Sequence, residues 1–212
     1  EKVGLLMRSY ARNLSTQASL ETIAADMQAN EPKKMDTDTV SSYISALAKL
    51  FVVEESKAWN PNLRSKTAIR TSNTRYYTDP SIGTASLSIG PKDLENDLNT
   101  FGYFFETLAI RDLRTYAEAL MGEVAHYRDA DKLECDAVVH LRDGRYGLIE
   151  IKLGGEALIK EGVKSLTALK NKLDTTKMNK PSFLMVLTGV GSIAYRRPED
   201  GIYVVPIGCL KP

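Results

Sequence analysis

Two acids and a lysine are the residues of this sequence whose types and spacing are suited to chemistry. They are Asp136 and, fourteen residues later, the run Glu150-Ile151-Lys152. The stretch that contains them otherwise has the alternating apolar composition of a buried β-hairpin. A three-residue loop over 142–144, with Gly144 in the left-handed conformation, is a common connection for such a hairpin. This loop predicts that Asp136 lies opposite Glu150, with Lys152 two residues further along the same face.

Two adjacent carboxylates repel each other, which raises the pKa of one of them unless a cation neutralises the pair. Lys152 supplies one positive charge, whereas Mg²⁺ (or Mn²⁺ in its place) supplies two and prefers carboxylate and carbonyl oxygens. Glu106, within an apolar helical run, costs free energy to bury unless something pairs with it. We therefore expect Asp136, Glu150 and Glu106 to be metal ligands. The alternatives are an ordinary salt bridge between Glu150 and Lys152 and, for Glu106, a cap of a neighbouring group or a pairing with Arg111 or Arg114.

The elements around the hairpin are predicted from the spacing of apolar residues. A long helix follows Pro91, and a continuous apolar strand near 182–189 suggests a central strand covered on both faces. The remaining expected elements are strands near 123–129, 133–141 and 146–153, a helix over 156–173 and a closing hairpin. Together they predict an α/β sandwich over 91–212.

The first third of the chain carries helical patterns. Ser19 and Asp38 are the predicted N-caps of the second and third helices, and strand-like residues follow the third helix. This order is typical of a winged helix-turn-helix, which we place at 1–80. The Ser- and Gly-rich stretch 81–90 is then expected to be a linker between the two domains.

The third helix exposes small polar residues, and the segment 57–78 is the most basic of the chain, as expected of a wing that contacts phosphates. Both features indicate DNA binding, although a winged helix can also dock protein partners. The expected DNA contacts are Ser41, Ser42, Ser45 and Lys49 on the helix and Arg64, Lys66 and Arg70 in the wing.

The composition is that of a water-soluble globular protein. The chain has 212 residues, a formal net charge of +1 and 43% hydrophobic residues, so nucleic-acid affinity must come from local patches. No run is apolar enough to span a membrane, and two cysteines without metal-ligand spacing fit a reducing cytoplasm. No Walker A phosphate loop is present.

The sequence predicts a helix with Glu106, a strand, a strand with Asp136, a tight turn, a strand with Glu150 and Lys152, and a helix. This order of elements resembles that of the PD-(D/E)xK nuclease superfamily. The resemblance implies that the acids hold Mg²⁺ and that Lys152 positions or activates the attacking water. Cys135 stands where that superfamily commonly has proline. The sequence is compatible with two interpretations. The site cuts nucleic acid, or it is a nuclease-like scaffold in a non-catalytic DNA- or protein-binding module.

Nearly the whole chain also resembles the C-terminal region of prokaryotic AAA-type ATPases of poorly characterised function. The segments that carry the resemblance include "LLMRSYARNLS", "RYYTDPSIG", "GYFFETLAIRDL" and "LECDAVVHLRDGRYGLIEIKLG". The resemblance implies a winged helix followed by a nuclease-like domain. It also implies an upstream ATPase domain as a partner within the same protein, with ATP bound only there. Glu1 in place of an initiator Met suggests a fragment of a longer chain.

Overall fold

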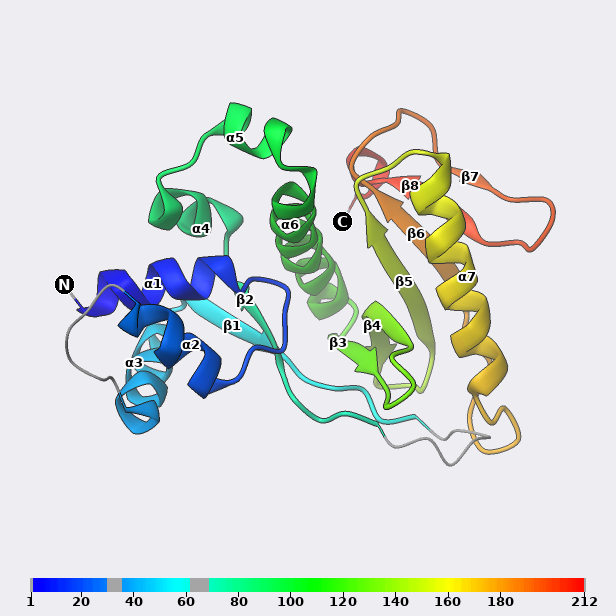
Figure 1. Cartoon of the computed structure of the whole chain (residues 1–212). Helices are drawn as coiled ribbons and strands as arrows, with labels where there is room; N and C mark the ends of the chain where they lie inside the picture. Colours follow the sequence, from blue (N-terminus) through cyan, green and yellow to red (C-terminus); the bar gives the residue numbers. More distant parts are fainter. Residues whose placement is uncertain (1, 30–35, 62–68, 212) are drawn as a thin grey trace. The chain divides into compact units, whose positions relative to one another are not determined.

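The chain forms two compact units, each with its own core (Figure 1). The computed structural model describes residues 2–29, 36–61 and 69–211. The first unit comprises Glu1–Ser56 and Asn73–Leu108, and the second comprises Lys57–Ser72 and Ala109–Pro212. The chain therefore passes into the second unit and back before it enters that unit for the last time.

The first unit is mainly helical. Three helices, α1 (Lys2–Arg12), α2 (Leu20–Gln28) and α3 (Thr37–Lys49), precede an antiparallel pair of strands, β1 (Val53–Ser56) and β2 (Thr74–Tyr77). Then follow α4 (Pro80–Leu87), α5 (Pro91–Asn96) and the first part of α6 (Leu98–Ala119). The core gathers apolar side chains from all three leading helices, among them Leu6, Tyr10, Ile23, Met27, Val40 and Ile44.

Of the two predicted N-caps, the structure confirms the first and not the second. Ser19 caps α2, since its side chain accepts a hydrogen bond from the backbone N–H of Thr22. The prediction of Asp38 as the cap of α3 is wrong. Asp36 caps this helix by accepting from the N–H groups of Asp38 and Thr39. Asp38 lies in the first turn, where a negative charge interacts favourably with the positive end of the helix dipole. Both aspartates therefore stabilise the start of α3.

The expected linker at 81–90 is largely a helix. Asp79 accepts a hydrogen bond from the N–H of Ser81, and Pro80 occupies the first turn of α4. The small residues that suggested a linker instead allow close packing. A Cβ atom on Gly83 would lie 3.0 Å from Leu14 Cδ1 and 3.2 Å from the Tyr77 ring. The described part of the chain contains no helix long and apolar enough to cross a bilayer.

A six-stranded mixed sheet forms the second unit, with the strand order β3-β4-β5-β6-β8-β7. Neighbouring strands pair antiparallel except for β5–β6 and β6–β8, which are parallel. The strands are β3 (Gly122–Arg128), β4 (Glu134–Leu141), β5 (Tyr146–Lys152), β6 (Phe183–Thr188), β7 (Tyr195–Arg196) and β8 (Tyr203–Pro206). Helix α7 (Glu156–Lys172) packs along β5 and β6, and a short 3₁₀ turn, Ile207–Cys209, follows β8 (Figure 1).

The first part of the segment expected to be a wing, Lys57–Ser72, belongs to the second unit instead, whereas the rest stays in the first unit. Trp59 is buried against Tyr127 and Tyr146, and its backbone N–H donates to the carbonyl of His126 at 2.7 Å. The returning chain pairs with the same strand, β3, where the N–H of Arg70 donates to the carbonyl of Arg128. Burying a tryptophan side chain is more favourable than leaving it on an exposed wing, which explains why Trp59 packs at the sheet edge. Arg64 and Lys66 lie outside the described residues, and Arg70 is exposed.

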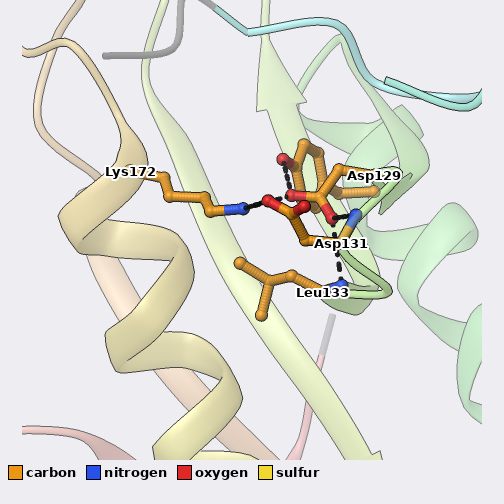
Figure 2. A network of polar contacts seen from close by, with 5 residues as sticks. Asp129, Asp131, Leu133 and Lys172 are labelled. Carbon is orange, nitrogen blue, oxygen red and sulfur yellow. Dashed lines mark hydrogen bonds and ion pairs between the residues drawn. The ribbon is translucent and has the colours of Figure 1, made fainter. Parts of the chain in front are cut away.

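A buried carboxylate ties the β3–β4 turn to the end of α7 (Figure 2). Asp129 is fully buried and accepts hydrogen bonds from the Tyr127 hydroxyl and from the N–H groups of Asp131 and Leu133. Lys172 reaches it from α7 at 2.7 Å and also contacts Asp131 at 2.9 Å. Burial by itself would raise the pKa of Asp129, but the bonds from Lys172, Tyr127 and Leu133 outweigh burial and lower it.

We expect Asp129→Asn to lower the free energy of unfolding by about 3 kcal/mol at pH 7, because it removes one partner of a buried ion pair. The exposed partner provides the control, since Asp131→Asn should cost less than about 1 kcal/mol. Urea unfolding monitored by circular dichroism measures both. A lowered pKa means that the contribution of Asp129 is present above pH ~4 and is lost as the pH falls. Equal effects of the two substitutions would contradict this role for Asp129.

Candidate functional site

The β4–β5 hairpin has the register predicted from its loop. Ala137 pairs with Ile149 and Val138 with Leu148, so Asp136 is level with Glu150. The loop is closed by hydrogen bonds from the N–H of Gly144 to Leu141 and from the N–H of Leu141 to Arg145. Gly144 has φ +84°, the left-handed conformation that this loop requires.

The structure brings Asp136, Glu150 and Lys152 together on one face of the sheet. The Lys152 Nζ atom lies 2.9 Å from Glu150 Oε2 and 3.7 Å from Asp136 Oδ2. Beyond the last regular pair of the ladder, Asp136 Oδ2 also accepts a hydrogen bond of 2.7 Å from the backbone N–H of Ile151. The aspartate is therefore held by the strand that carries the other two residues.

Glu150 is the most deeply buried of the three charged side chains, with 4% of its side chain exposed, against 24% for Lys152. Its Oε2 atom binds Lys152, whereas its Oε1 atom is buried without a hydrogen-bond partner among the described residues. Burial, reinforced by the charge of Asp136, raises the pKa of Glu150 to about 8 even though Lys152 lowers it. One buried carboxylate oxygen thus lacks the partner that such groups normally have.

Gly162 on α7 explains how this carboxylate comes to be buried. A Cβ atom at Gly162 would lie 3.2 Å from the Glu150 Cβ atom and 3.1 Å from Val186 Cγ2, which is a tight contact. The glycine therefore lets α7 approach the sheet closely at the site. The sequence contained one signal for this, a glycine among Ile159, Val163 and Leu166 on the apolar side of the helix.

Cys135, where the nuclease-like pattern commonly has proline, is a buried neutral thiol. Its Sγ atom is 3.4 Å from the carbonyl oxygens of Ala137 and Ile149. Burial, together with the charges of Glu150 and Asp136, raises the pKa of the thiol well above its usual value. Cys135 therefore acts as a small apolar side chain behind the site rather than as a ligand or nucleophile.

Glu106 belongs to the first unit, where one of its carboxylate oxygens accepts a hydrogen bond of 2.6 Å from the Tyr76 hydroxyl. The expected DNA contacts on α3 also belong to that unit. Val40, Ile44 and Leu47 form the buried side of α3, while Ser42, Ser45 and Lys49 are exposed and Ser41 is half-buried. The placement of these four residues agrees with the predicted polar side of the helix.

The donor set at the hairpin fits a hard divalent cation. Asp136 and Glu150 offer carboxylate oxygens, one of them buried and unbonded, and Mg²⁺ typically takes one or two protein carboxylates and completes its shell with water and substrate phosphates. Across residues 2–29, 36–61 and 69–211 there is no group of three or more His, Cys, Asp or Glu side chains arranged to hold a metal. A cation bound by Asp136 and Glu150 would therefore take its remaining ligands from groups such as backbone carbonyls, water and substrate phosphates.

The raised pKa of Glu150 predicts a pH-dependent stability difference. Because the folded-state pKa of about 8 lies above the ordinary value of 4.5, the contribution of protonated Glu150 is present at low pH and is lost as the pH rises through 8. We expect Glu150→Gln to gain stability relative to the wild type by on the order of 1 kcal/mol per pH unit between about pH 5 and 8. Denaturant unfolding in the presence of a chelator, repeated across this range, measures the difference.

Glu156→Gln is the matched control, since Glu156 is an exposed acid of α7 that pairs with Lys160. Its stability difference from the wild type should not grow between pH 5 and 8. If the Glu150→Gln difference were equally flat, Glu150 would not be a buried, electrostatically strained carboxylate.

Comparisons with known proteins add family membership without an assigned activity. Residues 1–93 match the model of a domain of unknown function, DUF8612, and residues 101–210 match that of a second one, DUF4143. The latter is often found in the C-terminal region of AAA-ATPase proteins. No curated protein and no solved structure matches the chain. The DUF4143 match spans β3 to β8 and includes Asp136, Glu150 and Lys152, and this chain belongs to the DUF4143 family.

Proposed function

We propose that this chain binds DNA through its first unit and cleaves phosphodiester bonds at Asp136, Glu150 and Lys152 with the help of Mg²⁺. The observation that carries the proposal is the buried, unbonded Oε1 atom of Glu150 beside a second carboxylate and a lysine. A structural ion pair does not require a buried oxygen without a hydrogen-bond partner, whereas a carboxylate that binds a cation needs an oxygen available to coordinate it.

The first unit supports a winged helix-turn-helix assignment. Three helices lead into an antiparallel strand pair, the order expected of that fold. The chain between α1 and α2 extends the strand pair. The N–H of Ser15 donates to the Arg75 carbonyl at 2.9 Å, and the N–H of Arg75 donates to the Thr16 carbonyl at 3.0 Å.

The second unit supports a PD-(D/E)xK assignment by its element order. Part of helix α6, three antiparallel strands, helix α7 and the parallel strand β6 follow one another along the chain. Asp136 lies on the second of these strands, with Glu150 and Lys152 on the third. The fold by itself does not establish the chemistry, so the proposal depends on these three side chains.

Each side chain has a defined role in the proposed reaction. A bound Mg²⁺ ion would supply Lewis-acid polarisation of the phosphate and a lowered pKa of its bound water. Asp136 and Glu150 would hold the ion, and Asp136 is kept in position by the Ile151 N–H. Lys152 would orient the water and stabilise negative charge on the phosphate. Mn²⁺ would serve as a substitute for Mg²⁺ at these two carboxylates.

One observation favours a second candidate function. The Lys152 Nζ atom pairs with Glu150 at 2.9 Å, as expected of a salt bridge in a non-cutting module. In that case the chain is a DNA- or protein-binding module with a degenerate nuclease fold. Under both candidates we propose that an AAA-type ATPase domain of the same protein, working in the cytoplasm, binds ATP and acts on this region.

The nuclease proposal predicts metal-dependent nicking of supercoiled plasmid that is lost in Lys152→Ala. We expect activity with Mg²⁺ and Mn²⁺, none with chelator, and a loss of at least about 100-fold in the variant, since positioned charges contribute on that scale. Lys160→Ala is the control, because Lys160 is an exposed lysine of α7 paired with Glu156. Circular dichroism should show that both variants fold. DNA binding without nicking under every condition would favour the non-cutting module.

The DNA-binding proposal predicts that a negative charge on the exposed side of α3 weakens binding. We expect Ser45→Glu to raise the Kd for duplex DNA at least tenfold, and we expect the wild-type affinity to fall steeply with salt. Ser81→Glu adds the same charge to an exposed position in the first turn of α4 and should leave the Kd within about twofold. Fluorescence anisotropy measures both. Equal weakening would show that α3 makes no specific contact.

A further inference from the structure

A cationic cavity of about 430 Å³ lies in the second unit, remote from the proposed cleavage site. Its wall includes the first residues of β6, Phe183 and Leu184, and the last turn of α7. Lys152, in contrast, pairs with Thr188 at the other end of β6. Four to five strand residues separate the two places, or roughly 15 Å at 3.3 Å per residue.

Three cations line this cavity: Lys170, Lys180 and Arg196. All three are exposed, and among the described residues none of them forms an ion pair with a carboxylate. Their combined charge exceeds the partial negative charge of about one half at the C-terminus of α7. The cavity is therefore a region of positive potential within a chain whose net charge is only +1.

Neighbouring cations show that this lack of partners is local. Lys172, two residues after Lys170, binds Asp129 and Asp131. Arg197, next to Arg196, binds Asp200 through contacts of 3.0 and 3.2 Å. In each pair, one cation is neutralised within the protein and the other lines the cavity.

Asp200 is the acid that lines the cavity, and its charge is already engaged. Besides the contacts from Arg197, its Oδ1 atom accepts a hydrogen bond of 3.0 Å from the N–H of Ile202. A carboxylate held in this way competes weakly for Lys170, Lys180 or Arg196. These three cations are consequently left for a ligand.

Arg196 is held in place before any ligand arrives. Its guanidinium lies over the Tyr203 ring at 5.7 Å, and its Nε atom donates to the Gly201 carbonyl at 3.1 Å. An arginine oriented by ring stacking loses little freedom when its remaining N–H groups bind an anion. Asn171, Thr175 and Ser182 on the same wall provide neutral polar groups.

We propose that this cavity binds a phosphate group through Arg196, Lys170 and Lys180. A planar guanidinium matches the oxygens of a phosphate in a two-pronged contact, and lysines add point charges beside it. The phosphate has two sources, a small phosphate compound or the backbone of a nucleic-acid strand. This binding is independent of cleavage, because none of the three cations belongs to the group of Asp136, Glu150 and Lys152.

Titration calorimetry of the full chain tests the proposal with two probes, pyrophosphate and a 12-nucleotide single strand. Both probes are titrated into the Ser45→Glu background, in which binding through α3 is weakened. The double variant Lys180→Gln/Arg196→Gln should raise the Kd at least tenfold for one probe or both. Lys160→Gln/Lys164→Gln removes two charges from α7 outside the cavity lining and should change neither Kd by more than twofold. Arg196→Lys keeps the charge but loses the two-pronged contact, so its Kd should lie in between.

The pattern of effects identifies the source of the phosphate. Weakening confined to pyrophosphate assigns the cavity to a small phosphate compound, and weakening confined to the single strand assigns it to nucleic acid. If neither probe binds the starting protein, or if the cavity variant binds both probes as tightly as the control variant, the proposal is wrong. The titrations are run with a chelator and no divalent metal, so a failure of phosphate binding here and a failure of metal-dependent nicking in the plasmid assay are separate results.

Discussion

The hairpin register in the second unit is the constraint on which the candidate site depends. A loop of three residues ending in a left-handed glycine places Asp136 level with Glu150. A shift by one residue would send one of the two carboxylates to the opposite face of the sheet. In this register the Lys152 Nζ atom lies 2.9 Å from Glu150 and 3.7 Å from Asp136. The apolar residues on the other face stabilise the same pairing, so packing and chemistry favour one arrangement.

Burial turns this arrangement from a surface salt bridge into a strained group of charges. Helix α7 comes close to β5 because Gly162 has no side chain, and this contact helps to remove Glu150 from water. A desolvated carboxylate next to another acid is costly, and Lys152 offsets only part of that cost. Carboxylates that are buried at such a cost in free energy are commonly found at functional sites, so Glu150 supports a functional site more strongly than the fold does.

Elsewhere in the second unit, charges are arranged in a different way. Asp129 is as buried as Glu150, yet its oxygens receive bonds from a tyrosine, two backbone N–H groups and Lys172. A fully bonded carboxylate stabilises the turn that it occupies and has no capacity left for a ligand. The contrast between Asp129 and Glu150 separates a structural acid from a candidate ligand within a single sheet. The same reasoning separates Lys172 from Lys170.

Local patterns in the sequence determined the strands around the site, the hairpin register and the cap at Ser19, because alternation, loop length and capping act over a few residues. Only the tertiary structure decided which residues are buried together. Trp59 packs at the edge of β3 rather than on the expected wing, and most of the expected linker forms helix α4. Asp129 binds Lys172, which is 43 residues away in the sequence. Such contacts depend on which distant surfaces exclude water from each other, and short-range spacing carries no information about that choice.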